Sequence, residues 1–181
     1  MSLEFNIAGK AGQKQQRKLL ATYVNVNPDA TGISDCEWEL QGLGVESSAV
    51  EYNMEIDTKH DITGVVESDV KYTEPTQEFD PNTVRCGRKL SAILCDIERR
   101  CAFEEYSGFY VLLVQGFLQD SKKAMAAEVH SGCTIEVSSL GGDSYVDQPF
   151  TIHFSNNKTL GTVPAISASP AFTAAGSAGV G

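Results

Sequence analysis

Apolar and polar residues alternate with a period of two along residues 50–57 and again along residues 66–72. This period is typical of strands that bury one face and expose the other to water. The two runs lie on either side of Asp61, so they predict two long antiparallel strands joined by a tight reversal at that point.

The predicted reversal fixes which charges face one another. With its centre near Asp61, Glu55 lies opposite Glu67 and Glu51 lies opposite Lys71. The first of these pairs is like-charged, which is locally unfavourable across two strands. A solvated face that keeps its acids at this cost indicates that something outside the chain's own fold shapes it.

Further strands are predicted by short runs rich in apolar and β-branched residues. Residues 17–26 form one such run, closed by the turn signal Asn27-Pro28-Asp29, and residues 36–43 alternate like a half-buried strand. The other predicted strands are residues 109–117, 124–138, 150–154 and 159–163, of which the last two form a hairpin around Asn156-Asn157-Lys158.

The period changes to 3.6 between residues 83 and 101, which predicts a helix with one apolar stripe. The stripe consists of Cys86, Leu90, Ile93, Leu94, Ile97 and Cys101. One helix among seven or eight strands predicts a mainly β fold: a β-sandwich or partly closed barrel with one flanking α-helix and a long β-hairpin.

The length of 181 residues suits one domain with a real core. The predicted organisation is a flexible N-terminal arm over residues 1–16, a β-sandwich domain over 17–166 and an Ala/Gly/Ser-rich tail over 167–181. Residues 165–181 form either a flexible tail or an arm that orders on a partner, and their composition favours the tail.

Charge and cysteine usage exclude several classes of protein. The 24 acidic and 14 basic residues give a net charge of −10, which disfavours a protein that grips nucleic acid through phosphates. The N-terminus has no signal segment, and the most apolar run, 109–118, is about half the length of a membrane-spanning helix. Five cysteines without a CxxC spacing argue against a disulfide framework and a zinc site, so we expect a soluble protein of the reducing cytosol.

The best candidates for nucleophilic chemistry are weak. His130 and Cys133 are three residues apart, which on a regular strand directs the two side chains to opposite faces. Cys86 and Cys101 fall on the apolar helix stripe, where a cysteine is usually a small core residue. We therefore expect no catalytic residues.

Metal and carboxylate chemistry has no better basis. Asp57, His60 and Asp61 gather at the predicted hairpin tip, but their spacing fits neither a calcium loop nor a zinc pair. The evenly spaced acids of the hairpin single out no glycosidase pair. We expect no metal, no cofactor and no enzymatic activity.

The order of the elements resembles a known family. The hairpin through residues 60–64 to 71–75, the segment Gln77-Glu78-Phe79-Asp80-Pro81, the single helix, Gly141-Gly142-Asp143 and the closing strands 149–154 and 160–163 are similar to the major tail tube protein of long-tailed bacteriophages. The likeness covers roughly residues 17–166.

This resemblance implies a structural virion protein whose copies form hexameric rings, stacked into a hollow tube through which DNA leaves the particle. It implies further partners in the tape measure, tail terminator and baseplate proteins, transient passage of DNA without specific binding, no membrane, and a place in the virion tail after assembly in the bacterial cytoplasm.

An acidic channel wall would repel DNA and let it slide, because each phosphate contact with a basic wall releases counterions and adds attraction. We therefore expect the acids of the hairpin to line the lumen. The ordinary alternative is that they form the solvated side of an antiparallel sheet. The candidate residues are Glu51, Glu55, Asp57, Glu67 and Asp69.

Two other functions compete with the tail tube. The inner tube of a contractile tail, or of a tail-derived injection system, has the same kind of subunit. A monomeric β-sandwich binding module is the less favoured alternative, since such modules usually present aromatic contacts and this chain has one tryptophan, Trp38.

Overall fold

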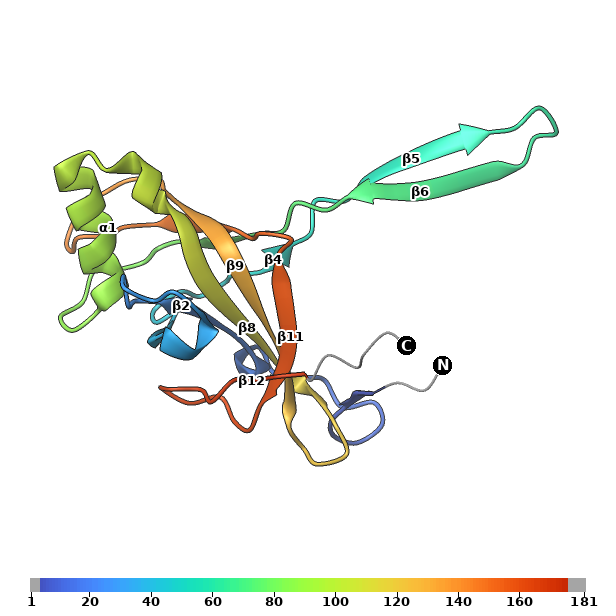
Figure 1. Ribbon diagram of the computed structural model, residues 1–181, viewed down its shortest axis with the longest axis horizontal. Helices are drawn as coiled ribbons and strands as arrows, with labels where there is room; N and C mark the ends of the chain where they lie inside the picture. The colour runs from blue at the N-terminus through green and yellow to red at the C-terminus, as the bar shows by residue number, and fades with distance from the viewer. Residues whose placement is uncertain (1–3, 176–181) are drawn as a thin grey trace.

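The computed structural model describes residues 4–175, and it is mainly β with one α-helix (Figure 1). Within these residues ten strands form one curled, half-barrel sheet, and two more strands form a small sheet of their own. The first half of the chain contributes β1 (Asn6–Ile7), β2 (Leu20–Asn25), β3 (Trp38–Leu40), β4 (Val50–Glu51), β5 (Glu55–His60), β6 (Val66–Tyr72) and β7 (Thr76–Phe79). The second half contributes α1 (Lys89–Arg100), β8 (Ser107–Gln119), β9 (Met125–Val137), β10 (Phe150–His153), β11 (Lys158–Val163) and β12 (Thr173–Ala174). Single 3-10 turns lie at Arg17–Leu19, Ile33–Asp35 and Phe103–Tyr106. The predicted fold class is confirmed.

The large sheet is built around the long ribbon of β8 and β9. The strand order is β3-β2-β8-β9-β10-β7-β4, with β1 on β8 and with β11 and β12 beyond β9. The sheet does not close on itself, because its outermost strands in this order, β3 and β4, are three and two residues long and lie at opposite edges.

Both faces of the central strands are buried. One face packs into a core with helix α1, where Leu90 and Leu94 meet Phe79 and Phe150, whose rings stack with centroids 5.0 Å apart. The opposite face carries a second core around Tyr23, covered by Trp38 and by Phe172 from the C-terminal segment. The body is therefore a layered structure with an apolar core on each side of its central strands.

Helix α1 begins later than the pattern predicted. Gly87 has a positive φ of 84° and Arg88 is extended, so the helix starts at Lys89. The carboxylate of Glu39 accepts a hydrogen bond from the Lys89 N–H at 2.7 Å and forms an ion pair with Arg88 at 3.3 Å. An acid at a helix N-terminus satisfies free N–H groups and complements the helix dipole.

The assignment of two cysteines to the apolar stripe of this helix was wrong. Cys86 precedes the helix and Cys101 ends it in a left-handed conformation, and both are exposed. Leu90, Leu94 and Ile97 from the predicted stripe are buried, as expected.

The predicted hairpin of β10 and β11 was also wrong. Both strands pair with β9, β10 with its residues 134–137 and β11 with its residues 125–130. They therefore lie end to end along one edge of β9, interrupted at residues 154–157. The local turn signal at Asn156-Asn157 marks a break in one line of pairing rather than a reversal.

The segments at the two ends of the chain lie against the body where they are described. β1 pairs with the end of β8, and the 165–175 segment adds β12 to β11 while the Tyr23 hydroxyl donates to the Ser167 carbonyl at 2.8 Å. The tail interpretation therefore does not hold for residues 165–175. Residues 1–3 of the predicted arm and 176–181 of the predicted tail lie outside the described residues.

Candidate assembly interface

The small sheet of β5 and β6 projects from the body as an arm, which we define as residues 55–72 (Figure 1). Residues 58–71 are all exposed. A two-stranded hairpin is marginal on its own in water, because it has no second layer to cover it. The arm thus differs from every other long pair of strands in the described chain.

The tip of the arm makes several hydrogen bonds of its own. The Asp61 carboxylate accepts from the Thr63 hydroxyl at 2.7 Å, the Thr63 N–H at 2.8 Å and the Val65 N–H at 2.9 Å, and Gly64 takes a positive φ of 83°. A three-residue loop that ends in a left-handed glycine is a common hairpin connection. These bonds, the Thr63 hydroxyl first, lower the pKa of Asp61.

The reversal is centred on residue 63 rather than on Asp61, so the predicted register was wrong. Glu67 lies opposite Lys59, and Asp57 lies opposite Asp69, where the like-charged pair is found. The β-bulge between Glu55 and Ile56 then brings the Glu55 carboxylate to 3.0 Å from the Lys71 ammonium.

The shift in register is even, so the two faces of the arm keep their predicted membership. One face carries the acids Glu55, Asp57, Glu67 and Asp69 together with Lys59 and Lys71; we call it the charged face. The other carries Ile56, Thr58, His60, Val66, Ser68 and Val70; we call it the apolar face.

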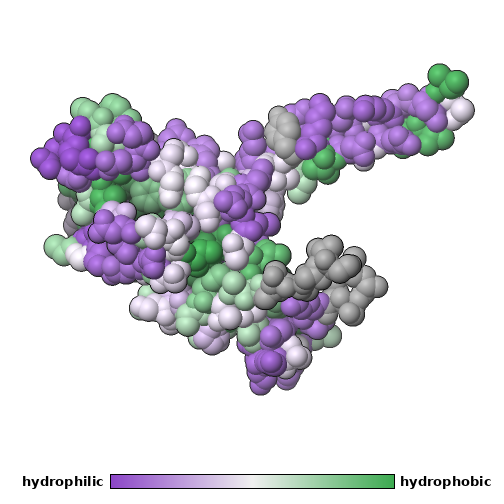
Figure 2. Space-filling model, in the orientation of Figure 1, coloured by the Kyte–Doolittle hydropathy of each residue, from purple (hydrophilic) through white to green (hydrophobic). Residues whose placement is uncertain are grey.

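The apolar face is where the prediction of one buried face fails. Ile56, Val66 and Val70 are 59%, 55% and 57% exposed. At the tip Ile62 is fully exposed. Figure 2 shows the arm as a long hydrophilic projection with apolar atoms at its tip and along one side. On this face Ile56 lies opposite Val70, and the Thr58–Ser68 pair separates them from Val66.

Four of the five predicted lumen residues share the charged face, and Glu51 does not. Glu51 belongs to β4 in the body, where it pairs with Thr76. It lines a cleft of about 450 Å³ with Glu78 and Asp80. The structure therefore brings together Glu55, Asp57, Glu67 and Asp69 and separates Glu51 from them.

The functional feature that sequence reasoning missed is the exposure of Ile56, Val66 and Val70. Their alternation with polar residues was read correctly, but a pattern of period two is the same whether the apolar face is buried by the same chain or by another one. No signal in the sequence separates the two cases, because residues 52–54 continue the alternation that the structure interrupts between β4 and β5.

His130 and Cys133 lie on the same face of β9, contrary to the prediction. Gly132 has a positive φ of 83° at a point where the β8–β9 register shifts, and this extra residue reverses the alternation. Burial raises the pKa of the Cys133 thiol to about 11. The imidazole of His130 is held between the Ser155 carbonyl at 2.7 Å and the Glu128 carboxylate at 3.2 Å. Both groups thus have structural partners.

Metal binding and membrane insertion were also tested against the described residues. Among residues 4–175 no group of three or more His, Cys, Asp or Glu side chains is placed to hold a metal ion. In the same residues no helix is long and apolar enough to span a bilayer.

Comparison with solved structures gave six matching chains. No family model and no curated protein matched the chain. The chain is similar to the tube-terminating cap of the anti-feeding prophage, with 13% identity, a TM-score of 0.45 and coverage of 86% of this chain and 96% of that one. It is also similar to the sheath/tube terminator of an extracellular contractile injection system called PVC, with 9% identity, a TM-score of 0.46 and coverage of 83% and 99%.

Proposed function

We propose that this chain is a structural subunit of a tail tube, of a phage or of a tail-derived injection system, and that its copies join into rings through the arm. The observation that carries the proposal is the apolar face of the arm, exposed along a two-stranded sheet with no second layer. Covering Ile56, Val66 and Val70 by a second copy would remove this surface from water and give the arm the layer that it lacks.

A ring also accounts for the open body sheet. An unpaired strand edge in a monomer is a template for unwanted pairing, and closure with neighbours around a ring removes it. The half-barrel ends at the short strands β3 and β4. In our proposal the rings are hexameric, as the sequence resemblance implies, and they stack into a tube.

In this arrangement the charged face of the arm is the side that points away from the neighbouring copy. With the apolar face against a neighbour, Glu55, Asp57, Glu67 and Asp69 remain on the opposite side of the same two strands. We place them toward the bore, where carboxylates would repel passing DNA and keep it from binding. The exposed ion pair of Lys71 with Glu55 contributes little to stability and leaves the face acidic.

The contractile class was the alternative interpretation of the sequence, and one structural match is named as part of a contractile injection system. The proposal therefore covers both kinds of tube.

Electron microscopy of the purified protein tests the proposal, with two matched double variants. The wild-type protein is expected to form rings with a central opening. Val66→Asp with Val70→Asp, on the apolar face, is expected to abolish ring formation. Glu67→Lys with Asp69→Lys, on the same strand but on the charged face, is expected to leave the rings intact.

The second variant also tests the position of the acids. If they line the bore, assembled Glu67→Lys, Asp69→Lys tubes will retain duplex DNA at low salt while wild-type tubes will not, as a gel-shift assay can measure. A wild-type protein that stays monomeric at high concentration contradicts the proposed function. Rings that survive the aspartate pair contradict the role of the apolar face.

A further inference from the structure

The β8–β9 ribbon has two chemically different ends. At one end β8 begins beside helix α1, and at the other the turn of residues 120–124 leads into β9 (Figure 1). A 13-residue strand separates them by about 40 Å at the usual rise of 3.3 Å per residue. Neither end belongs to the arm.

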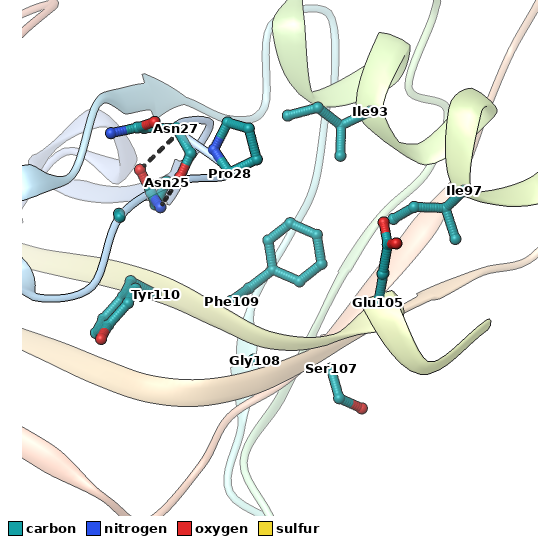
Figure 3. A pocket seen from close by; sticks show the side chains of 11 residues that line it. Asn25, Asn27, Pro28, Ile93, Ile97, Glu105, Ser107, Gly108, Phe109 and Tyr110 are labelled. Atoms are coloured by element: carbon teal, nitrogen blue, oxygen red, sulfur yellow. Dashed lines mark hydrogen bonds between the residues drawn. The ribbon is translucent and has the colours of Figure 1, made fainter. Parts of the chain in front are cut away.

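A groove lies at the first end, between α1 and the start of β8. Its volume is about 250 Å³. The Phe109 ring lies in it between Pro28 and the helix residues Ile93 and Ile97, with the amides of Asn25 and Asn27 at one side (Figure 3). The side chains of Ile93 and Phe109 are only partly buried, so the groove presents an apolar floor to the surface.

The segments that line this groove are rich in acidic residues. Glu105 lines it and shares Arg100 with Asp96, while Asp96 also binds Arg99. Three more acids lie in the adjoining segments and take part in no ion pair among the described residues: Asp29, Glu98 and Glu104. One carboxylate thus lines the groove, and four more lie in or beside the segments that form it, with two arginines among them.

The second end is basic. The turn carries Lys122 and Lys123, and the segment after β1, which pairs with the end of β8, brings Lys10 and Lys14 to the same end. All four lysines are exposed, and none forms an ion pair within residues 4–175.

The turn carries hydrogen bonds of its own. The Asp120 carboxylate accepts from the Lys122 and Ala124 N–H groups, each at 2.8 Å, and this bonding occupies the acid of the turn.

We infer that the groove between α1 and β8 of one copy receives the lysine turn 120–124 of a second copy, in the adjacent ring. The occupant is indicated by charge complementarity: an acidic groove and a basic turn lie at opposite ends of the same ribbon. The aliphatic stems of Lys122 and Lys123 can cover Phe109 and Ile93 while their ammonium groups reach the acids at the rim.

This contact rests on the proposed function and completes it. The arm joins copies within a ring, and the groove and turn join one ring to the next. Head-to-tail contacts of this kind continue indefinitely in one direction, which is what a tube requires. The repeat along the tube would then be close to the ribbon length of about 40 Å.

Charge reversal at the two ends tests the contact in the full-length protein. Lys122→Glu with Lys123→Glu is expected to leave single rings intact and to reduce stacked rings at least about tenfold, because like charges then meet at the rim. Asp29→Lys with Glu104→Lys is expected to do the same from the other side. The readouts are electron microscopy and sedimentation velocity.

The decisive variant carries all four changes in one chain. Opposite charges then face each other again, so stacking is expected to return. Arg85→Glu, which changes an exposed charge outside both surfaces, is the control and is expected to stack like the wild type. At about 1 M salt, where screening acts within about 3 Å, wild-type stacks are expected to separate into single rings.

The outcomes separate this inference from the function on which it rests. A wild-type protein that forms no rings contradicts the proposed function itself. Wild-type stacks that are unaffected by the lysine reversals, or a four-fold variant that stays unstacked while both double variants form sound rings, overturn the contact between groove and turn.

Discussion

The body and the arm have the same alternating pattern of apolar and polar residues, but the body strands are buried and the arm strands are exposed. In the body, strands β2, β8 and β9 have both faces covered, one by helix α1 and one by the segments that carry Trp38 and Phe172. In the arm neither face of β5 and β6 is covered, and residues 58–71 are all exposed. The difference teaches that amphipathic alternation specifies a surface for burial without specifying which molecule buries it.

The largest expected effect is a break of the body core. Phe150 is fully buried and stacks on Phe79, so Phe150→Ala is expected to lower the free energy of unfolding by about 3–5 kcal/mol through lost burial and a cavity. Urea denaturation measures it. Val70→Ala in the arm is the comparison and is expected to cost under about 0.5 kcal/mol in the unassembled protein. Equal costs for the two variants would contradict the contrast between body and arm.

A smaller effect is expected at an ionic cluster within the body. The pKa of Glu128 lies below its ordinary value of 4.5, mainly because the His130 side chain donates a hydrogen bond to its carboxylate. The Lys158 ammonium lowers this pKa further. The stability that Glu128 contributes is therefore fully present above pH 4.5 and is lost as the pH falls through the lower pKa of the folded state.

Urea midpoints between pH 6 and pH 3 measure this contribution, with Glu128→Gln as the reference. The wild type is expected to lose stability more steeply than the variant as the pH falls, so the two curves converge. Parallel curves would show that the cluster does not hold the folded state.

The smallest expected effect is local opening of the arm, which can be compared between the unassembled protein and assembled rings. In the unassembled protein the amides of residues 55–72 are expected to exchange with deuterium much faster than those of β8 and β9, because the arm opens without the body. In assembled rings the arm amides are expected to become protected. Hydrogen exchange followed by mass spectrometry compares the two, and an arm that stays unprotected in rings would contradict its role.

Much of the body could be predicted because its signals are periodic and local. Strands β2 and β9 and helix α1 lie within the predicted segments, and β8 contains its predicted segment 109–117 and extends two residues beyond each end, since each presents a sustained apolar pattern. What was missed depends on single residues or on distant partners. Gly132 reverses the alternation between His130 and Cys133. The hydrophobic pattern of the sequence does not predict a bulge of one residue.

The sequence also did not predict correctly which strands pair with one another. The Asn156-Asn157 signal was interpreted as a hairpin turn. In the structure β10 and β11 both pair with β9, whose edge is long enough for the two strands. Of the candidate site, the grouping of four acids on one face of the arm was predictable, because side chains alternate strictly along paired strands. The separation of Glu51 was not, since the break after β4 involves Asn53 in a left-handed conformation.

The exposed arm has a consequence for how copies survive in a cell. Exposed segments with few tertiary contacts are where proteases cut first, and residues 58–71 form such a segment in a solitary subunit. A neighbour that covers them withdraws the cleavage sites. If the arm joins copies as proposed, surplus copies would be degraded while assembled ones persist.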